Sequence, residues 1–475
     1  MADIENPWHS RSIDVHRWSD HPEVAALCDR VWDGYLSELT GRSGPKPKTA
    51  FRHQLRVLIL DLYVAWLADP ELSIGVSMSS NYWDTSSRYN AIHISKKIIP
   101  IIRVLTKAGL LDMAKGSFSG PNSRGNRTTR IRASEELQGW FAEAQFQRDD
   151  VGRVEGEEII ILRSEEDGPL VEYEETDDTI RMRAELDRYN EVIASAFIDI
   201  PILEDPTLDG IPTDHHQKLT RRIFSRADWT CNGRFHGGWW QRINSDRRSR
   251  IFINDTPAVE VDFRSLHISL LSLQSGVELT GDPYELRQGL IGGAPERLQR
   301  NLVKRLLLTA INARKKDAAF RAFRDGFPTG HMGKTLTNEQ LETLLLAFLE
   351  KTPHIEGLLF NDQGIRLMNL DSQLTERVHR HFSEQGIPVL SVHDSYVIDY
   401  TRVAELKDIM AEASEAVAGV ALPTSNQFFG LDEQDDPSAD YVRDYVIWRQ
   451  TARSEGYLAR LAEHERRTGT EVVPY

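Results

Sequence analysis

The sequence predicts an α+β protein that contains more than one domain. A chain of 475 residues is long enough for about two or three domains with separate cores. Residues 51–132 carry two helical patterns followed by a basic hairpin pattern, whereas residues 213–435 alternate long helical patterns with short strand patterns. Two such different arrangements of helices and strands indicate two separately folded parts.

The composition is that of a soluble protein, with 40% hydrophobic and 27% charged residues. The first residues contain no apolar run typical of a signal peptide, and no stretch keeps 18 apolar residues together. The two cysteines, Cys28 and Cys231, lie far apart in the sequence, which favours a reducing compartment over a disulfide framework or a cysteine-based zinc site. We therefore expect a cytoplasmic protein with no membrane partner.

The net charge of −15 conceals a strong segregation of charge along the chain. Residues 86–132 contain ten Lys or Arg residues and one acidic residue, whereas residues 149–182 contain thirteen Asp or Glu residues and three Arg residues. A basic segment of this kind is typical of a nucleic-acid-binding surface. The acidic segment is most simply a solvated surface, and mimicry of a nucleic acid is the alternative.

Residues 1–145 are predicted to form a winged helix-turn-helix domain. Helical periodicity covers 51–72 and 94–113, where Ser95 suits the N-cap position and Gly109 ends the helix. A strand, a loop rich in Gly, Ser and Arg, and a returning strand follow. In a winged helix one helix enters the major groove and the hairpin touches the backbone. Such domains also bind proteins, but the basic charge favours nucleic acid, with five contacts expected: Lys96, Lys97, Arg124, Arg127 and Arg130.

Three further parts are expected after this domain. Residues 146–212 are predicted to form an acidic connector that contains a helix, residues 213–435 a second domain, and residues 436–475 a helical tail. The second domain has a strand pattern at 258–263, a strand–turn–strand pattern at 388–400, and helical patterns at 294–316, 336–355, 366–387 and 402–419. Thr337 and Gln340 have the spacing of a capping box.

Two aspartates and a helix with spaced cations stand in order along the second domain. In VEVDF (259–263) apolar residues alternate with Glu260 and Asp262, so one face of the strand is acidic. Asp394 lies in the turn of the hairpin PVLSVHDSYVIDY, which taken alone is equally consistent with a solvated hairpin tip. Arg300 and Lys304 are four residues apart and share a helix face. If the two strands share a sheet, Asp262 and Asp394 meet at its edge.

Two carboxylates opposite a cationic helix suit metal-assisted phosphoryl transfer. Mg²⁺ binds one or two carboxylates together with phosphate oxygens and water, and Mn²⁺ is an alternative ion. A pair of such ions about 4 Å apart activates an attacking 3′-hydroxyl and stabilises the leaving pyrophosphate. We expect Lys304 and Arg300 to hold the triphosphate, where negative charge increases in the transition state.

With these aspartates and this cationic helix in order, the chain resembles the family A DNA polymerases and the phage-type single-subunit RNA polymerases, which share a right-hand palm. The resemblance covers roughly residues 218–400. DFRSLH (262–267) resembles motif A, RNLVKRLLLTAINA (300–313) resembles motif B of the fingers helix, and VHDS (392–395) resembles motif C. NGRF (232–235) resembles the Gly-Arg element that touches the primer–template, and GDPYE (281–285) resembles a segment that follows motif A.

The resemblance implies a palm with an antiparallel sheet, helical fingers and a set of site residues. Asp262 and Asp394 would bind metal together with the backbone of Phe263, and Arg300 and Lys304 would be the catalytic cations. The residues implied to contact nucleotide or nucleic acid are Arg234, His267, Asn312 and His393. Two of these residues also have simpler explanations. A local hydrogen bond would explain His393 at the hairpin tip, and an ion pair with a nearby acid would explain Arg234.

The chain departs from the DNA polymerases of this family at several positions. His267 stands where they usually carry Glu, and Asn312 stands where they carry Tyr. Leu308 replaces the fingers aromatic, and Ser395 after the motif C aspartate has the form of the RNA polymerases. The choice between deoxyribonucleotides and ribonucleotides is therefore open.

The sequence as a whole predicts a template-directed nucleotidyltransferase. It would be a DNA polymerase or primase–polymerase that adds nucleotides to a 3′ end with two Mg²⁺ ions, in replication of a mobile element. Its partners would be nucleoside triphosphates and DNA, as primer–template or origin duplex, or RNA. An RNA-synthesising polymerase or primase is the alternative within this class. A non-catalytic DNA-binding regulator built on a palm scaffold is the alternative from another class.

Overall fold

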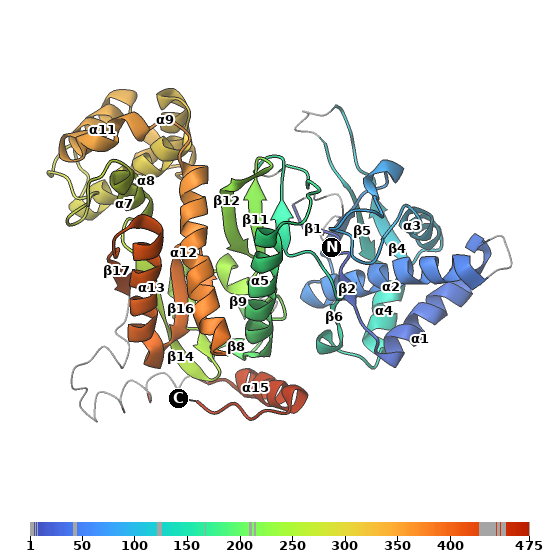
Figure 1. Cartoon of the computed structure of the whole chain (residues 1–475). Helices are drawn as coiled ribbons and strands as arrows, with labels where there is room; N and C mark the ends of the chain where they lie inside the picture. The colour runs from blue at the N-terminus through green and yellow to red at the C-terminus, as the bar shows by residue number, and fades with distance from the viewer. Residues whose placement is uncertain are drawn as a thin grey trace. The chain divides into compact units, whose positions relative to one another are not determined.

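The computed structural model describes residues 4, 6, 8–40, 45–120, 126–166, 168–208, 211–212, 215–426, 443, 447 and 453–474. The chain forms two compact units (Figure 1). Unit 1 comprises residues 1–158 and 207–216, and unit 2 comprises residues 159–206 and 217–475. Both units combine α-helices with sheets whose strands are mostly antiparallel, in agreement with the expected mixture of helices and strands.

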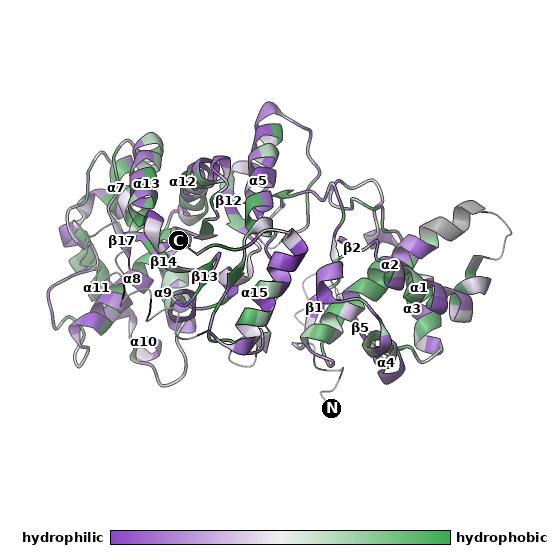
Figure 2. Ribbon diagram, turned by 90° about the horizontal axis from the view of Figure 1, so that it is seen from below, coloured by the Kyte–Doolittle hydropathy of each residue, from purple (hydrophilic) through white to green (hydrophobic). Residues whose placement is uncertain are grey.

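Unit 1 places helices around a four-stranded sheet. The helices are α1 (Pro22–Val31), α2 (Pro45–Ala68), α3 (Ile98–Lys107) and α4 (Glu135–Glu143). The sheet has the order β1–β3–β5–β4, from β1 (Ser10–Ser12), β3 (Ser73–Val76), β5 (Thr129–Ala133) and β4 (Leu111–Ala114). Shorter pairs join β2 (Arg17–Trp18) to β6 (Gly152–Arg153) and β9 (Thr207–Leu208) to β10 (Ile211–Pro212). The apolar residues of α2, green in Figure 2, belong to the core.

The basic hairpin expected in this unit is present. Strands β4 and β5 are antiparallel, and a further bridge between Ser117 and Arg127 continues the pairing into the connecting segment. The helix before it is shorter than the pattern 94–113 indicates, because residues 95–97 form a turn in which the Ser95 hydroxyl accepts from the Lys97 amide at 3.3 Å. Gly109, with φ +83°, follows the end of the helix as expected. The assignment as a winged helix stays a prediction.

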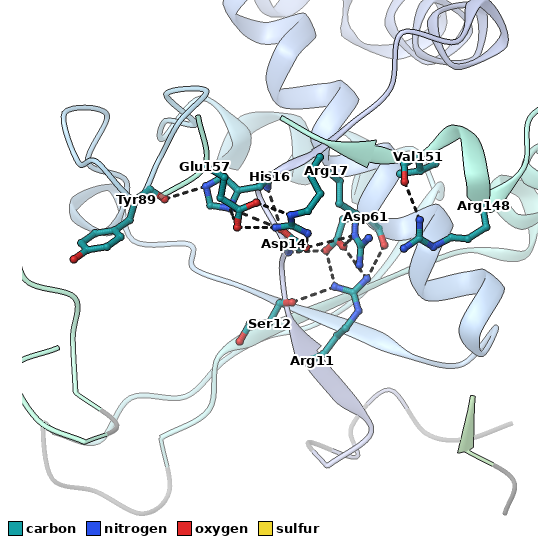
Figure 3. A network of polar contacts seen from close by, with 11 residues as sticks. Arg11, Ser12, Asp14, His16, Arg17, Asp61, Tyr89, Arg148, Val151 and Glu157 are labelled. Carbon is teal, nitrogen blue, oxygen red and sulfur yellow. Dashed lines mark hydrogen bonds and ion pairs between the residues drawn. The ribbon is translucent and has the colours of Figure 1, made fainter. Parts of the chain in front are cut away.

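A network of buried ion pairs holds the N-terminal segment of unit 1 onto α2 (Figure 3). The carboxylate of Asp61, which is fully buried, accepts from Arg11 at 2.9 Å and from Arg17 at 2.7 Å. Asp14 accepts two hydrogen bonds from Arg153, at 2.8 and 3.1 Å. Burial alone would raise the pKa of Asp14, but Arg153 outweighs it and holds that pKa well below its ordinary value. The network therefore favours the ionised form of Asp14.

Unit 2 is organised around two sheets. The larger one has the order β15–β16–β14–β13–β8, with β17 paired to β14. Its strands are β8 (Ile198–Asp199), β13 (Phe252–Ile253), β14 (Thr256–Phe263), β15 (Leu390–Val392), β16 (Ser395–Asp399) and β17 (Thr424–Asn426), all antiparallel to their neighbours. The smaller sheet joins β7 (Ile160–Leu162), β11 (Arg221–Ser225) and β12 (Asp228–His236). The strand and helix in the acidic segment thus belong to this unit.

The helices of unit 2 match most of the expected positions. They are α5 (Asp177–Ser195), α6 (Ser245–Arg248), α7 (Leu266–Gln274), α8 (Glu296–Asn312), α9 (Lys316–Asp325), α10 (Met332–Thr335), α11 (Asn338–Lys351), α12 (Gly364–Glu384), α13 (Val403–Ala418) and α15 (Glu455–Thr468). The capping box before α11 is confirmed, since the Gln340 amide donates to the Thr337 hydroxyl at 3.3 Å and the Thr337 amide donates to the Gln340 side chain at 2.9 Å. Trp239 and Trp240 are core residues.

Helix α12 connects the parts of unit 2. It packs against β12, α5, α13, α7 and α8, and α13 covers β14 and β16 (Figure 1). The last helix, α15, is anchored to the sheet because the hydroxyl of Tyr457, which is fully buried, donates to Asp255 at 2.8 Å. Arg460 on the same helix binds Asp199 at 2.7 Å. Helix α15 is therefore held against β8 and the turn between β13 and β14.

Candidate active site

The structure brings Asp262 and Asp394 to the same end of the larger sheet. Asp262 is the penultimate residue of β14 and lies opposite Ser395, the first residue of β16. Val392 pairs with Ser395, so His393 and Asp394 form a two-residue turn between β15 and β16. The amide of Phe263 donates to the carbonyl of Asp394 at 3.3 Å, which ties the two segments together. The strand register alone therefore determines that the two aspartates are neighbours.

The charges around Asp262 repel one another. Burial raises the pKa of Asp262 to about 7, and the negative charge of Asp394 acts in the same direction. Lys304 opposes the rise, which places its ammonium group within electrostatic reach of this carboxylate. Smaller contributions that raise the pKa come from Glu260 and Asp371. A cation bound between Asp262 and Asp394 would relieve this repulsion.

The serine of the VHDS segment has a local role. Its hydroxyl, on Ser395, donates to Glu260 at 2.6 Å across the β14–β16 pair. Arg248 binds the same carboxylate through two hydrogen bonds, at 2.9 and 3.0 Å. The carboxylate of Glu260 is therefore engaged by a bidentate arginine and by the hydroxyl of Ser395. The side chain of Ser395 is 6% exposed and engaged within the sheet.

Arg234 lies beside the two aspartates, between a buried carboxylate and a histidine. Its Nε donates to Asp371 Oδ2 at 2.6 Å, and its Nη2 donates to His267 Nε2 at 3.2 Å. Burial lowers the pKa of His267 to about 4, and the positive charge of Arg234 contributes to the decrease. Asp394 influences the pKa values of both His267 and Asp371, so all of these groups surround one site.

Asp371 is the site residue that sequence reasoning missed. It lies on α12, where Leu367, Leu374 and Val378 recur at helical spacing on the buried face. An aspartate on such an apolar stripe was the available signal, because a carboxylate is rarely buried without a partner. The expected pairing of Arg234 with a nearby acid also takes a different form, since its partner is 137 residues away.

The exposed face of α8 carries the residues expected to meet a nucleotide. Lys304, Leu308 and Asn312 are exposed, at successive spacings of four residues. In this structure the guanidinium of Arg300 is bound to Asp282, with Nε and Oδ2 2.5 Å apart, and lies over the ring of Tyr284. The contact with Asp282 uses the Nε donor of Arg300, and a guanidinium has four further N–H donors with which to bind a phosphate. The Asn312 amide donates to the Leu308 carbonyl at 2.8 Å.

The turn histidine, His393, lies at the end of the β15–β16 hairpin and has a φ of +58°. Its ring meets the ring of His236 edge to face at 5.8 Å. Burial, assisted by Arg234, lowers the pKa of His393, and burial lowers that of His236 to about 4. Both shifts favour the neutral imidazole, which offers hydrogen bonds rather than positive charge.

In unit 1 the expected nucleic-acid contacts fall into three groups. Lys96 and Arg127 are exposed, and Lys97 lies over the ring of Phe51 at 5.6 Å. Arg130 is only 5% exposed and donates to the carbonyl of Ile4 at 3.2 Å, so its guanidinium belongs to the interior of the unit. Arg124 lies outside the described residues.

Two absences among the described residues bear on the site. Among them, no group of three or more His, Cys, Asp or Glu side chains has the arrangement of a metal site. No helix in the described ranges is long and apolar enough to cross a lipid bilayer. Asp262 and Asp394 thus form a carboxylate pair, which is the number that Mg²⁺ needs when phosphate oxygens and water supply its other ligands.

Comparisons with known proteins give little beyond this geometry. No protein family and no curated protein matches the chain. Among solved structures, one similar chain is the POL domain of Pol1 from M. smegmatis, in a complex with DNA primer–template and dNTP. The sequence identity is 11%, the TM-score is 0.25, and the match covers 53% of this chain and 51% of that chain. The chain therefore spans about half of that structure.

Proposed function

We propose that unit 2 is a template-directed nucleotidyltransferase that extends the 3′ end of a nucleic-acid strand. One observation carries the proposal: strand register places Asp262 beside Asp394. The two aspartates are half-buried, the charge of Asp394 raises the pKa of Asp262, and the charge of Lys304 opposes that rise. A carboxylate pair opposite a cation is the arrangement that phosphoryl transfer requires, because the metal and the cation together neutralise a triphosphate. The order of the polymerase-like segments along the chain agrees with it.

The donor set fits Mg²⁺, with Mn²⁺ as an alternative. Carboxylate oxygens are the protein ligands that these ions prefer, and burial together with the charge of Asp394 raises the pKa of Asp262, which a bound cation would counteract. Asp262, Asp394 and the backbone carbonyl of Phe263 would hold the metal. When bound, two such ions lower the pKa of the attacking 3′-hydroxyl and stabilise the pyrophosphate that leaves.

The side chains of unit 2 divide the remaining tasks. Lys304 presents its ammonium group from the exposed face of α8 and would bind the triphosphate together with Arg300, whose Nε is bound to Asp282. Asn312, at the end of the same face, would lie near the sugar and base of the incoming nucleotide. Arg234 and His393 would contact the end of the growing strand, His393 as a neutral hydrogen-bonding group.

Two features bear on the choice of sugar. Ser395 resembles the RNA polymerase form, but its hydroxyl is bound to Glu260, so it fills a place in the sheet rather than a place beside the nucleotide. His267 is bound to Arg234, which holds its ring beside the aspartates. We propose DNA synthesis, by a polymerase or primase–polymerase, with RNA synthesis as the alternative.

Unit 1 would supply the attachment to nucleic acid. Its exposed basic residues, Lys96 and Arg127 among them, lie on the helix-and-hairpin segment typical of a winged helix. A DNA-binding unit joined to a small polymerase suits initiation at an origin. We therefore propose replication of a mobile element as the setting.

Incorporation of labelled nucleotides tests the function. The wild-type protein is incubated with primed and unprimed DNA and RNA templates, Mg²⁺ or Mn²⁺, and dNTPs or NTPs, beside Asp262→Asn and Asp394→Asn. Asp408→Asn, which changes an exposed aspartate on α13, is the matched control. We expect incorporation by wild type and control and none by the two site variants. No incorporation under any condition, with DNA binding retained, would favour the non-catalytic regulator instead.

A further inference from the structure

The buried carboxylate of Asp371 is placed where a catalytic centre rather than a stable core would need it. The residue is fully buried on α12, and one of its oxygens receives the Arg234 Nε at 2.6 Å. The other oxygen, Oδ1, is buried and has no hydrogen-bond partner among the described residues. A half-satisfied buried carboxylate destabilises a core. Its position is therefore best explained by what it does to Arg234.

Arg234 is held from two sides. Asp371 accepts from Nε, His267 accepts from Nη2, and both contacts have ordinary hydrogen-bond lengths. The carboxylate and the imidazole come from α12 and α7, so two helices fix the plane of one guanidinium. A guanidinium has five N–H donors. The contacts with Asp371 and His267 use two of these donors, and within the described part of the chain the other three make no hydrogen bond and can bind a ligand.

The hydrogen bond from Arg234 also determines the form of His267. An arginine can only donate, so Nε2 of the histidine must be the acceptor and carry no proton. A neutral imidazole that accepts at Nε2 carries its proton on Nδ1. Arg234 therefore fixes the tautomer of His267 as well as its position.

We propose that Asp371 is a positioning residue of the proposed polymerase centre, holding Arg234 in one orientation so that it grips the end of the growing strand and fixes His267 as an Nδ1–H tautomer. The inference rests on the proposed function. Asp371 does not touch the reacting atoms, and its effect passes entirely through Arg234. Without this support the guanidinium of Arg234 could rotate about its side-chain bonds. Misplacement of a group in an active centre by about 1 Å can cost on the order of a hundredfold in rate.

A double-mutant cycle tests the inference. Asp371→Asn, Arg234→Ala and the double variant are compared with wild type in steady-state incorporation on a primed template. Asparagine keeps the shape and one acceptor oxygen but not the charge, so we expect kcat to fall at least tenfold. In the Arg234→Ala background the same substitution should change kcat by less than about twofold, because the group it positions is already absent.

Glu376→Gln is the matched control for a purely structural effect. Glu376 lies on the same helix and binds a different buried arginine, Arg222, at 2.7 Å. Both substitutions should lower the midpoint of thermal unfolding, but only Asp371→Asn should lower kcat. The inference would be overturned, with the proposed function intact, if Glu376→Gln lowered kcat as much as Asp371→Asn does. It would also be overturned if the loss of kcat in the double variant equalled the product of the losses in Asp371→Asn and Arg234→Ala.

The tautomer of His267 tests the role of Asp371 independently of enzymatic activity. Imidazole ¹⁵N signals of His267, assigned by comparison with His267→Gln, should report an Nδ1–H tautomer at pH 7 in the wild type and a mixture of tautomers in Asp371→Asn. An unchanged tautomer would contradict the inference. If the wild type incorporates no nucleotide, the proposed function fails, and the tautomer alone then supports or overturns the role of Asp371.

Discussion

Replacing Asp394 by asparagine should stabilise the metal-free protein even though it removes a residue of the proposed active centre. The pKa of Asp262 is raised from its ordinary 3.8 to about 7, with burial as the largest cause and Asp394 as the second. The whole rise is equivalent to roughly 4 kcal/mol against the ionised form. Because Asp394 supplies the smaller part, we expect Asp394→Asn to increase the free energy of unfolding by about 1–2 kcal/mol at pH 8.

The gain should depend on pH in a defined direction. The pKa of Asp262 is higher in the folded protein than in the unfolded chain, so ionisation of this group lowers stability. The loss is absent well below pH 3.8, where Asp262 is protonated in both states, is still small at pH 4, and is complete above pH of about 7. Asp394→Asn should therefore gain stability between these values and show little gain at pH 4.

Differential scanning calorimetry in EDTA at pH 4, 6 and 8 measures this effect, with Asp408→Asn as the control for an exposed aspartate in the same unit. The scans are repeated with Mg²⁺, which should stabilise the wild type more than Asp394→Asn because the ion needs both carboxylates. A variant that is less stable than wild type at pH 8, or equally stabilised at every pH, would refute the argument that the two aspartates repel each other.

Three other predictions follow from the contacts of single residues. Lys304→Ala should lower kcat/KM for the incoming triphosphate by about 100-fold, since the loss of one preorganised donor has an effect of this size. The melting temperature of the protein should not change, because the side chain of Lys304 is exposed. Asp61→Ala should destabilise unit 1 by about 3–5 kcal/mol in urea unfolding, because two arginines lose their buried partner; a loss below about 1 kcal/mol would contradict this. Arg127→Ala should weaken DNA binding and reduce the slope of log K against log salt by about 1, whereas Arg130→Ala should lower stability instead.

Local patterns in the sequence predicted most of the elements of unit 2. Alternation of apolar and acidic residues identified β14, and helical spacing identified α8, α11 and α12 within a few residues of their bounds. The N-terminus of α3 was misjudged, because Ser95 caps a short turn rather than the helix. Such boundaries depend on one or two hydrogen bonds, which periodicity does not report.

The sequence by itself determined which residue types stand at the ends of β14 and of the β15–β16 turn, and therefore which carboxylates could meet. Only the tertiary structure decided their surroundings. Long-range pairing took Ser395 and Arg248 to Glu260, Asp282 to Arg300, and α12 to Arg234, across separations of up to 137 residues. Periodicity reports which face of an element is buried, whereas the partner of a buried charge depends on how separate elements pack. Asp371 is for this reason visible in the sequence only as an acid on an apolar stripe, and in the fold as the support of Arg234.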